Sequence, residues 1–172
     1  LWDKGVGEFA EAAAMLRAQD IDAKFVLVGK PDPGNPASVP QVQIEQWVAQ
    51  DRLEWWGFSN DMATTLTHSS IVCLPTFYGE GIPKSLLEAA ACGKPIVTTD
   101  SPGCREVVRD RENGFLVPIK NSEALARALK TLIVDSDKRR TFGEKSRAIA
   151  EEEFGIEQVT EETLEIYREL MG

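Results

Sequence analysis

The sequence predicts an α/β fold in which a doubly wound parallel sheet is flanked by helices. Short β-branched and apolar runs alternate along the chain with segments whose apolar residues recur at helical spacing. These runs are continuously apolar, which is typical of strands that are covered on both faces. Glycine or proline follows most of them, as expected where a strand ends in a loop.

The composition fits a single folded domain and limits its partners. Of 172 residues, 42% are hydrophobic and 27% are charged. The 28 acidic residues exceed the 19 basic ones, and a net charge of −9 argues against a nucleic-acid or anionic-membrane surface. Three cysteines without metal-binding spacing and one histidine predict neither a metal site nor a disulfide framework, and they suit a reducing cytoplasm.

The amino-terminal part begins with a helix over 5–18, where apolar residues follow helical spacing. The run 23–29 predicts a strand buried on both faces, and the prolines of 30–40 predict a loop. A second helix over 41–50 and a short strand over 53–56 follow. We expect three aromatic side chains of this part to pack in the core: Trp47, Trp55 and Trp56.

A short helix near 61–68, with Asn60 or Asp61 as its cap, precedes a buried strand over 71–75. A glycine-containing loop then leads into a helix over 83–91. A strand over 94–99, a short helix over 104–109 and a strand over 115–118 complete the alternating part of the chain. From residue 121 onward the pattern is helical, in the segments 121–134, 137–153 and 156–170.

The loop before the helix at 83–91 is the most informative part of the sequence. In such sheets, ligands bind at the carboxyl ends of the strands. Gly79 and Gly81 flank Glu80 directly after a buried strand, and glycine lets the backbone approach a ligand closely.

The start of the next helix has the properties of an anion site. Pro83 suits the first helical position, which places Lys84, Ser85 and Leu86 in the first turn. Unpaired amides and the positive end of the helix dipole favour an anion there, and Lys84 adds a full charge.

Two glutamates belong to the same candidate site. Helical side chains lean toward the amino end, so the carboxylate of Glu88 can lie near the anion site and accept hydrogen bonds from two hydroxyl groups, such as those of a ribose. Glu80 is at the mouth of the loop, where a sugar attached to a diphosphate would lie. The plain alternative is that both are solvent-exposed residues without a function.

The spacing of Glu80 and Glu88 within 79–89 resembles the signature of retaining glycosyltransferases of family 4. The segments 91–100, 103–107 and 113–117 are similar to the same family, and the likeness extends over essentially the whole chain. It is nearest to the CapM-like enzymes of bacterial capsule and lipopolysaccharide synthesis.

The resemblance implies one Rossmann-like half of a GT-B arrangement, namely the carboxyl-terminal domain that binds the sugar donor. Glu88 would bind the ribose hydroxyls and Glu80 the transferred sugar. Lys4 would pair with the diphosphate, and the backbone of Phe58 would meet the base. Donor contacts are further implied for the stretch of Gly81, Ile82, Pro83, Lys84, Ser85 and Leu86.

The family also has an arginine shortly before the lysine at position 4, a first strand of this domain and an amino-terminal acceptor domain, none of which is found in residues 1–172. We therefore interpret Leu1 as a cut and do not expect this chain alone to catalyse transfer. The final helix of the family reaches back to the acceptor domain. Several apolar side chains would then be partly uncovered here: Ile156, Val159, Ile166 and Leu170.

The expected reaction transfers a hexose or N-acetylhexosamine from a nucleoside diphosphate, expected to be UDP, to a glycan or lipid-linked acceptor, with no further cofactor. The expected partners are the donor and the acceptor domain, through which any contact with the inner face of the membrane would be made, and the expected location is the cytoplasm. One alternative is a binding module without catalysis. Another is a glycosidase with Glu80 and Glu88 about 5–9.5 Å apart, which is disfavoured because Glu88 lies inside a helix whose amino end favours phosphate.

Overall fold

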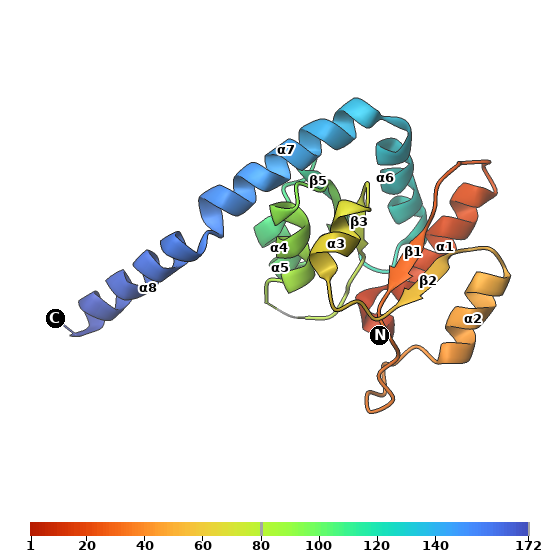
Figure 1. Cartoon of the computed structure of the whole chain (residues 1–172), viewed down its shortest axis with the longest axis horizontal. Coiled ribbons are helices and arrows are strands. Elements are labelled where there is room, and N and C mark those ends of the chain that lie inside the picture. Colours follow the sequence, from red (N-terminus) through yellow and green to blue (C-terminus); the bar gives the residue numbers. More distant parts are fainter. Residues whose placement is uncertain (80, 172) are drawn as a thin grey trace.

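The computed structural model describes residues 1–79 and 81–171. They form an α/β body from which a long carboxyl-terminal helix projects (Figure 1). The strands are β1 (Val26–Val28), β2 (Glu54–Gly57), β3 (Val72–Leu74), β4 (Ile96–Thr99) and β5 (Gly114–Val117). The helices are η1 (Trp2–Lys4), α1 (Val6–Arg17), α2 (Gln41–Ala49), α3 (Met62–Thr67), α4 (Lys84–Ala91), α5 (Pro102–Val107), α6 (Ser122–Val134), α7 (Ser136–Glu153) and α8 (Ile156–Met171).

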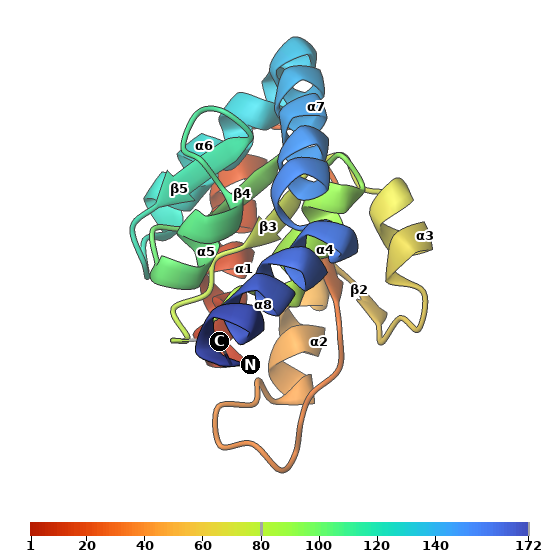
Figure 2. The same ribbon diagram turned by 90° about the vertical axis from the view of Figure 1, so that its left-hand side faces the viewer.

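The described strands form two parallel sheets, one of β1 and β2 and one in the order β3-β4-β5. Helices flank both sheets, so the predicted α/β class with parallel strands is confirmed. Figure 2 shows α7 crossing the body on the α4 side before the chain continues into α8. Among the described residues, no helix is long and apolar enough to span a membrane.

Burial differs between the strands. All four residues of β4 are buried, as expected for a strand with a neighbour on each side and helices above and below. Every residue of β1 is only half-buried, although the run 23–29 predicts burial on both faces. Phe25 is buried, but the prediction is wrong for Val26–Val28, because the edge of β1 that faces away from β2 borders a cavity of about 790 Å³.

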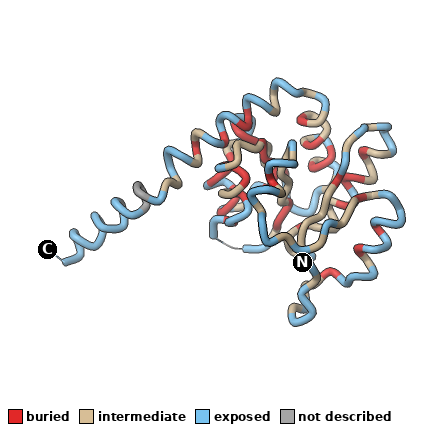
Figure 3. Tube along the Cα trace, viewed as in Figure 1, coloured by how far each residue is buried: buried red, intermediate tan, exposed pale blue. Residues whose placement is uncertain are grey.

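The core consists of two clusters, and the red segments in Figure 3 lie on the inner faces of the elements that build them. Leu16 of α1 and Leu125 of α6 belong to the cluster that covers the β1 side. Leu86 of α4 and Val107 of α5 belong to the second cluster, around β4. In contrast, every residue of α8 whose exposure the structure describes is exposed (Figure 3).

Local sequence accounts for most helix boundaries. The Asp61 carboxylate accepts a hydrogen bond from the Thr64 amide (2.9 Å) and caps α3, as predicted, and Asn121 caps α6 through the Ala124 amide (2.8 Å). The helix predicted over 104–109 instead begins at Pro102, whose fixed φ suits the first helical position.

Three tryptophans were expected in the core, and two lie there. Trp47 is buried and Trp55 packs against the core, with its indole donating to the Gly29 carbonyl (2.8 Å). The expectation is wrong for Trp56, which is half-exposed on β2 and donates to the Glu54 carboxylate (3.1 Å). Neighbouring residues of a strand point to opposite faces, so only one of the adjacent pair can face the core.

Candidate functional site

The short helix η1 docks onto the loop that follows β3. The carbonyl of Asp3 accepts hydrogen bonds from the amides of Phe77 (2.8 Å) and Tyr78 (3.1 Å), and from the Thr76 hydroxyl (3.1 Å). The ammonium of Lys4 consequently lies over the Tyr78 ring, 5.1 Å from its centroid. The structure therefore brings Lys4 to the loop in which the sequence placed the sugar-binding carboxylate.

Glu80 itself lies outside the described residues, so its position relative to Glu88 stays a prediction. The flanking glycines can be described. A β-carbon added at Gly79 or Gly81 would have no atom within 4 Å among the described residues. The backbone at these two glycines is therefore open to close approach, which is what the expected ligand contact requires.

The start of α4 differs in two respects from the expectation, which put Pro83 at the first helical position and left the Leu86 amide unpaired. Pro83 is the N-cap and Lys84 the first helical residue. The amide of Leu86, expected to be unpaired, donates to the Pro83 carbonyl (3.0 Å), and the Leu86 side chain is fully buried. The first amides of a helix have no intrahelical acceptor, so those of the exposed Lys84 and Ser85 remain for an anion. Ile82, before the cap, is also exposed.

The carboxylate of Glu88 lies toward the amino end of α4, as predicted. Its Oε1 atom is 3.3 Å from the Nζ atom of Lys84, one helical turn away. The Glu88 side chain retains 33% of its exposure, whereas that of Lys84 retains 88%. A carboxylate, an ammonium and the helix start thus share one end of α4.

The carboxyl ends of β1 and β2 contribute a second part of the site. Phe58 follows β2 and is exposed, and the ammonium of Lys30, after β1, lies 5.1 Å from the centroid of its ring. The Gly29 amide donates to the Gly57 carbonyl (2.7 Å), which holds the two loops together. The sequence indicated Phe58 but not Lys30, whose position after a strand-ending glycine was the available signal.

The two parts lie along one cavity. The cavity of about 790 Å³ between β1 and β3 is lined by Lys4, Lys30 and Ser85 where it reaches the carboxyl ends of the strands. Lys84, Glu88 and Phe58 are not among its lining residues. The predicted residues that the structure describes therefore lie at the carboxyl ends of the strands, with Phe58 on one side of the cavity and the start of α4 on the other.

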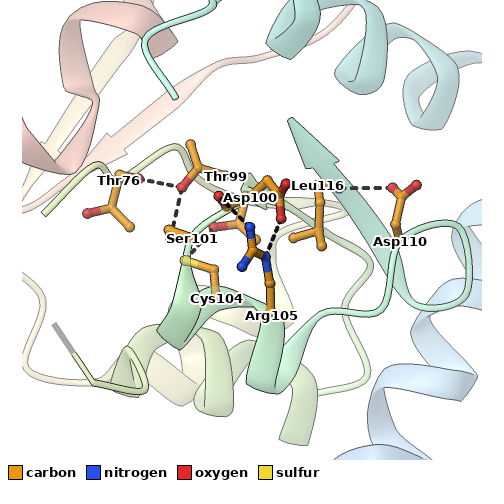
Figure 4. A network of polar contacts seen from close by, with 9 residues as sticks. Thr76, Thr99, Asp100, Ser101, Cys104, Arg105, Asp110 and Leu116 are labelled. Atoms are coloured by element: carbon orange, nitrogen blue, oxygen red, sulfur yellow. Dashed lines mark hydrogen bonds and ion pairs between the residues drawn. The ribbon is translucent and has the colours of Figure 1, made fainter. Parts of the chain in front are cut away.

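A polar network, which the sequence analysis missed, supports this edge (Figure 4). The Thr99 hydroxyl donates to the Thr76 carbonyl, and the Thr98 hydroxyl donates to the Leu74 carbonyl (2.6 Å). All three threonines are buried, so these bonds satisfy polar groups that would otherwise be costly to bury. The available signal was the run of threonines at the end of a β-branched strand.

The Asp100–Arg105 ion pair lies next to this network. Arg105 Nε is 2.5 Å from Asp100 Oδ1, and this hydrogen bond, together with the nearby positive charge, lowers the pKa of Asp100 below its usual value (Figure 4). Both side chains are about half-exposed. In the described part of the chain, no three His, Cys, Asp or Glu side chains lie close enough together to hold a metal ion.

Comparison with known proteins points to one family. The family model described as glycosyl transferases group 1 matches residues 1–149. The N,N'-diacetylbacillosaminyl-diphospho-undecaprenol alpha-1,3-N-acetylgalactosaminyltransferase of Campylobacter jejuni is 36% identical over 139 residues, which are 81% of this chain and 35% of the relative. The chain thus spans about a third of the length of that protein.

Solved structures show the same fold. HepE from Anabaena, determined in complex with UDP, is 26% identical with a TM-score of 0.87, over 98% of this chain and 46% of HepE. The carboxyl-terminal domain of a group 1 glycosyl transferase from Francisella tularensis is 26% identical with a TM-score of 0.76, over 91% of this chain and 82% of that domain. The expected relationship to GT-B glycosyltransferases is confirmed. The chain belongs to the group 1 glycosyl transferases.

Proposed function

We propose that this chain is the donor-binding domain of a retaining, family 4-type glycosyltransferase that uses a UDP-linked hexose or N-acetylhexosamine. The observation that carries the proposal is the grouping of Lys84, Glu88 and two first-turn amides at one end of α4, with Lys4 docked on the preceding loop. The likeness to HepE, whose structure contains UDP, supports UDP as the nucleotide of the donor. The likeness to the carboxyl-terminal domain from Francisella tularensis supports a carboxyl-terminal position of this chain in the full-length protein.

The chemistry follows from the charges at this end of α4. When the bond between the sugar and the diphosphate breaks, negative charge builds on the departing UDP. Lys4, Lys84 and the free amides of α4 stabilise that charge, while the Glu88 carboxylate accepts hydrogen bonds from the ribose hydroxyls. Glu80 positions the sugar for attack by an acceptor hydroxyl on the same face. The glycan or lipid-linked acceptor is bound by a separate amino-terminal domain in the cytoplasm or at the inner face of the membrane.

Binding of UDP tests the donor site directly. We expect calorimetric titration of the chain with UDP to give weak binding, and Glu88→Gln to lower the affinity about tenfold, because a hydrogen bond to a charged group contributes about 1.5–3 kcal/mol. The control is Glu144→Gln, which removes a similar i, i+4 ion pair (Arg140 Nη1 to Glu144 Oε1, 3.0 Å) from α7. Equal affinities of the two variants would contradict the proposed role of Glu88.

The full-length protein separates an enzyme from a binding module. With UDP-glucose, UDP-galactose and their N-acetylated forms as donors, we expect transfer to a glycan or lipid-linked acceptor and release of UDP. UDP binding without transfer would favour a binding module. Hydrolysis of a glycan without UDP binding would favour a glycosidase and overturn the proposal.

A further inference from the structure

Lys120 has an unusual backbone conformation at the point where β5 leads into α6. Its φ is 54°, in the left-handed region that glycine and asparagine adopt more readily than residues with long side chains. Three other described non-glycine residues have a positive φ, and each lies between a helix and the next strand: Asp20, Asp51 and Arg111. Lys120 instead follows a strand, so it lies at the carboxyl edge of the sheet, where the candidate site is.

The ammonium of Lys120 lies over an aromatic ring of this edge. Its Nζ atom is 4.5 Å from the centroid of the Phe77 ring, a distance at which the face of an aromatic ring attracts a cation. Phe77 belongs to the segment 75–79, here called the β3 loop, which follows β3. Both β3 and β5 are neighbours of β4, so the Lys120 side chain connects their loops across the carboxyl end of β4.

The β3 loop is thus held by two separate parts of the chain. The first is η1, where the Asp3 carbonyl accepts hydrogen bonds from the amides of Phe77 and Tyr78. The Lys4 ammonium, at the end of η1, lies over the Tyr78 ring. The second is the turn after β5, which contributes Lys120. Two consecutive rings of the loop therefore each contact a lysine from a different element.

The contact with Lys120 adds to bonds that already join the ends of the three strands. The Thr99 hydroxyl donates to the Thr76 carbonyl and connects β4 to the β3 loop (Figure 4). The Asp100 amide donates to the last carbonyl of β5 (2.8 Å) and connects β4 to β5. Lys120 extends this connection to Phe77, one residue further along the β3 loop. The path of the loop beyond its buried first residues therefore depends on this side chain.

We propose that Lys120 is a positioning residue for the donor sugar. Its ammonium holds the Phe77 ring, and with it the β3 loop, where the open backbone at Gly79 can meet the sugar. This inference rests on the proposed function, which gives the loop its ligand. Strained backbone such as that of Lys120 persists where surrounding contacts fix it, and it is frequent at ligand sites.

Amide hydrogen exchange of this chain tests the positioning without any ligand. Lys120→Gln removes the charge, and Lys120→Arg keeps a cation that can lie over the ring. We expect the amides of Phe77 and Tyr78 to exchange about fivefold faster in Lys120→Gln and at the wild-type rate in Lys120→Arg. The control is Lys130→Gln, which removes the same charge from α6, where Lys130 Nζ donates to Gln19 Oε1 (2.7 Å). It should leave both rates unchanged.

A double-mutant cycle identifies the ring as the partner of the charge. Phe77→Leu keeps an apolar side chain and removes the aromatic face. In this background, Lys120→Gln should not accelerate exchange of the Tyr78 amide any further. Unchanged exchange in Lys120→Gln alone would overturn the proposal, and so would an equal acceleration in Lys120→Gln and Lys120→Arg.

Kinetics of the full-length protein test the consequence for the sugar, with the UDP-sugar that supports transfer as donor. We expect Lys120→Gln to lower kcat/KM for the donor about fivefold, and to change the inhibition constant of UDP by less than about twofold, because UDP has no sugar to position. Lys120→Arg should restore kcat/KM. A general loss of folded protein would weaken UDP binding equally.

The outcomes for Lys120 and for the proposed function are distinct. Wild-type kcat/KM in Lys120→Gln, with UDP still bound, would overturn the role of Lys120 alone. A wild-type protein that does not bind UDP would overturn the proposed function and the sugar contact with it.

Discussion

Gly5 stands so close to Pro75 that a β-carbon at position 5 would lie 2.1 Å from the Pro75 carbonyl oxygen. Gly5 also has a left-handed backbone, with a φ of 74°. This contact joins the turn between η1 and α1 to the chain that follows β3. It places Lys4 beside the loop after β3, because Lys4 immediately precedes Gly5.

Replacing Gly5 by alanine should destabilise the fold and disturb the site. Overpacking costs about 1–3 kcal/mol, and an alanine in the left-handed backbone conformation costs about 1–2 kcal/mol. We therefore expect the free energy of unfolding, measured with urea, to fall by at least about 2 kcal/mol. The control is Gly34→Ala, where the nearest atom to an added β-carbon is Asp32 Oδ1 at 3.7 Å. If both variants unfold at the same urea concentration, the close contact at Gly5 does not contribute to stability.

Removing the charge of Lys84 should affect binding more than stability. We expect Lys84→Met to weaken UDP binding about tenfold, since a charge-assisted hydrogen bond contributes about 1.5–3 kcal/mol. The free energy of unfolding should change by less than about 1 kcal/mol, because an exposed i, i+4 pair contributes about 0.3–0.5 kcal/mol.

Lys24→Met is the matched control for this variant. Lys24 is 80% exposed and lies 3.4 Å from the Glu54 carboxylate, close to the geometry of Lys84 and Glu88, but it precedes β1 at the opposite edge of the sheet. Calorimetry of the two variants against UDP distinguishes a specific contact from a general effect of net charge. A similar loss for both would contradict the role of Lys84.

Local signals in the sequence were sufficient to predict α1 to α8 and most strands, but not the short helix η1. The carboxyl-terminal helices differ from their predicted ranges by at most one residue at each end, because Asn121 and Asp135 cap α6 and α7 and the apolar spacing is regular. The uncovered apolar side chains expected on α8 are confirmed at Ile156, Ile166 and Leu170. The side chain of Val159 is not among those that the structure describes.

What the sequence could not supply was tertiary geometry. β1 is only half-buried because a cavity lies between it and β3, and no local sequence pattern predicts that cavity. The Leu86 amide is lost to the site because the first turn of α4 closes on Pro83, a detail of backbone geometry. The position of Lys30 was missed because the Phe58 ring that its ammonium contacts is distant in the sequence. The relative positions of residues on one helix, such as Lys84 and Glu88, were predicted best.

The cap of α6 gives a prediction about stability alone. The Asn121 side chain accepts a hydrogen bond from the Ala124 amide at 2.8 Å, which satisfies one of the first amides of this helix. Asn121→Ala should lower the free energy of unfolding by about 1 kcal/mol, measured by urea titration. Asn121→Asp keeps an acceptor oxygen at the same place and should retain most of the stability, whereas an equal loss in both variants would argue against capping.

The Asp100–Arg105 pair predicts how stability depends on pH. Because Arg105 lowers the pKa of Asp100, the folded state favours the ionised carboxyl more than the unfolded state does. The resulting stabilisation is fully present above the unfolded pKa of about 4, and it is lost as the pH falls through the lower, folded pKa. Arg105→Met should return the Asp100 titration toward its ordinary midpoint, followed by carbon NMR of the carboxyl group.

In urea unfolding, the same variant should be less stable than the wild type at pH 6, and the difference should shrink as the pH is lowered toward 2, because protonation of Asp100 removes its ion pair with Arg105. Arg111→Met is the control, because Arg111 is an exposed arginine that pairs instead with Asp110 (Nε to Oδ2, 3.5 Å). It should leave the Asp100 titration unchanged. A difference between wild type and Arg105→Met that stays constant from pH 6 to pH 2 would show that Arg105 stabilises the fold by packing rather than through the Asp100 carboxylate.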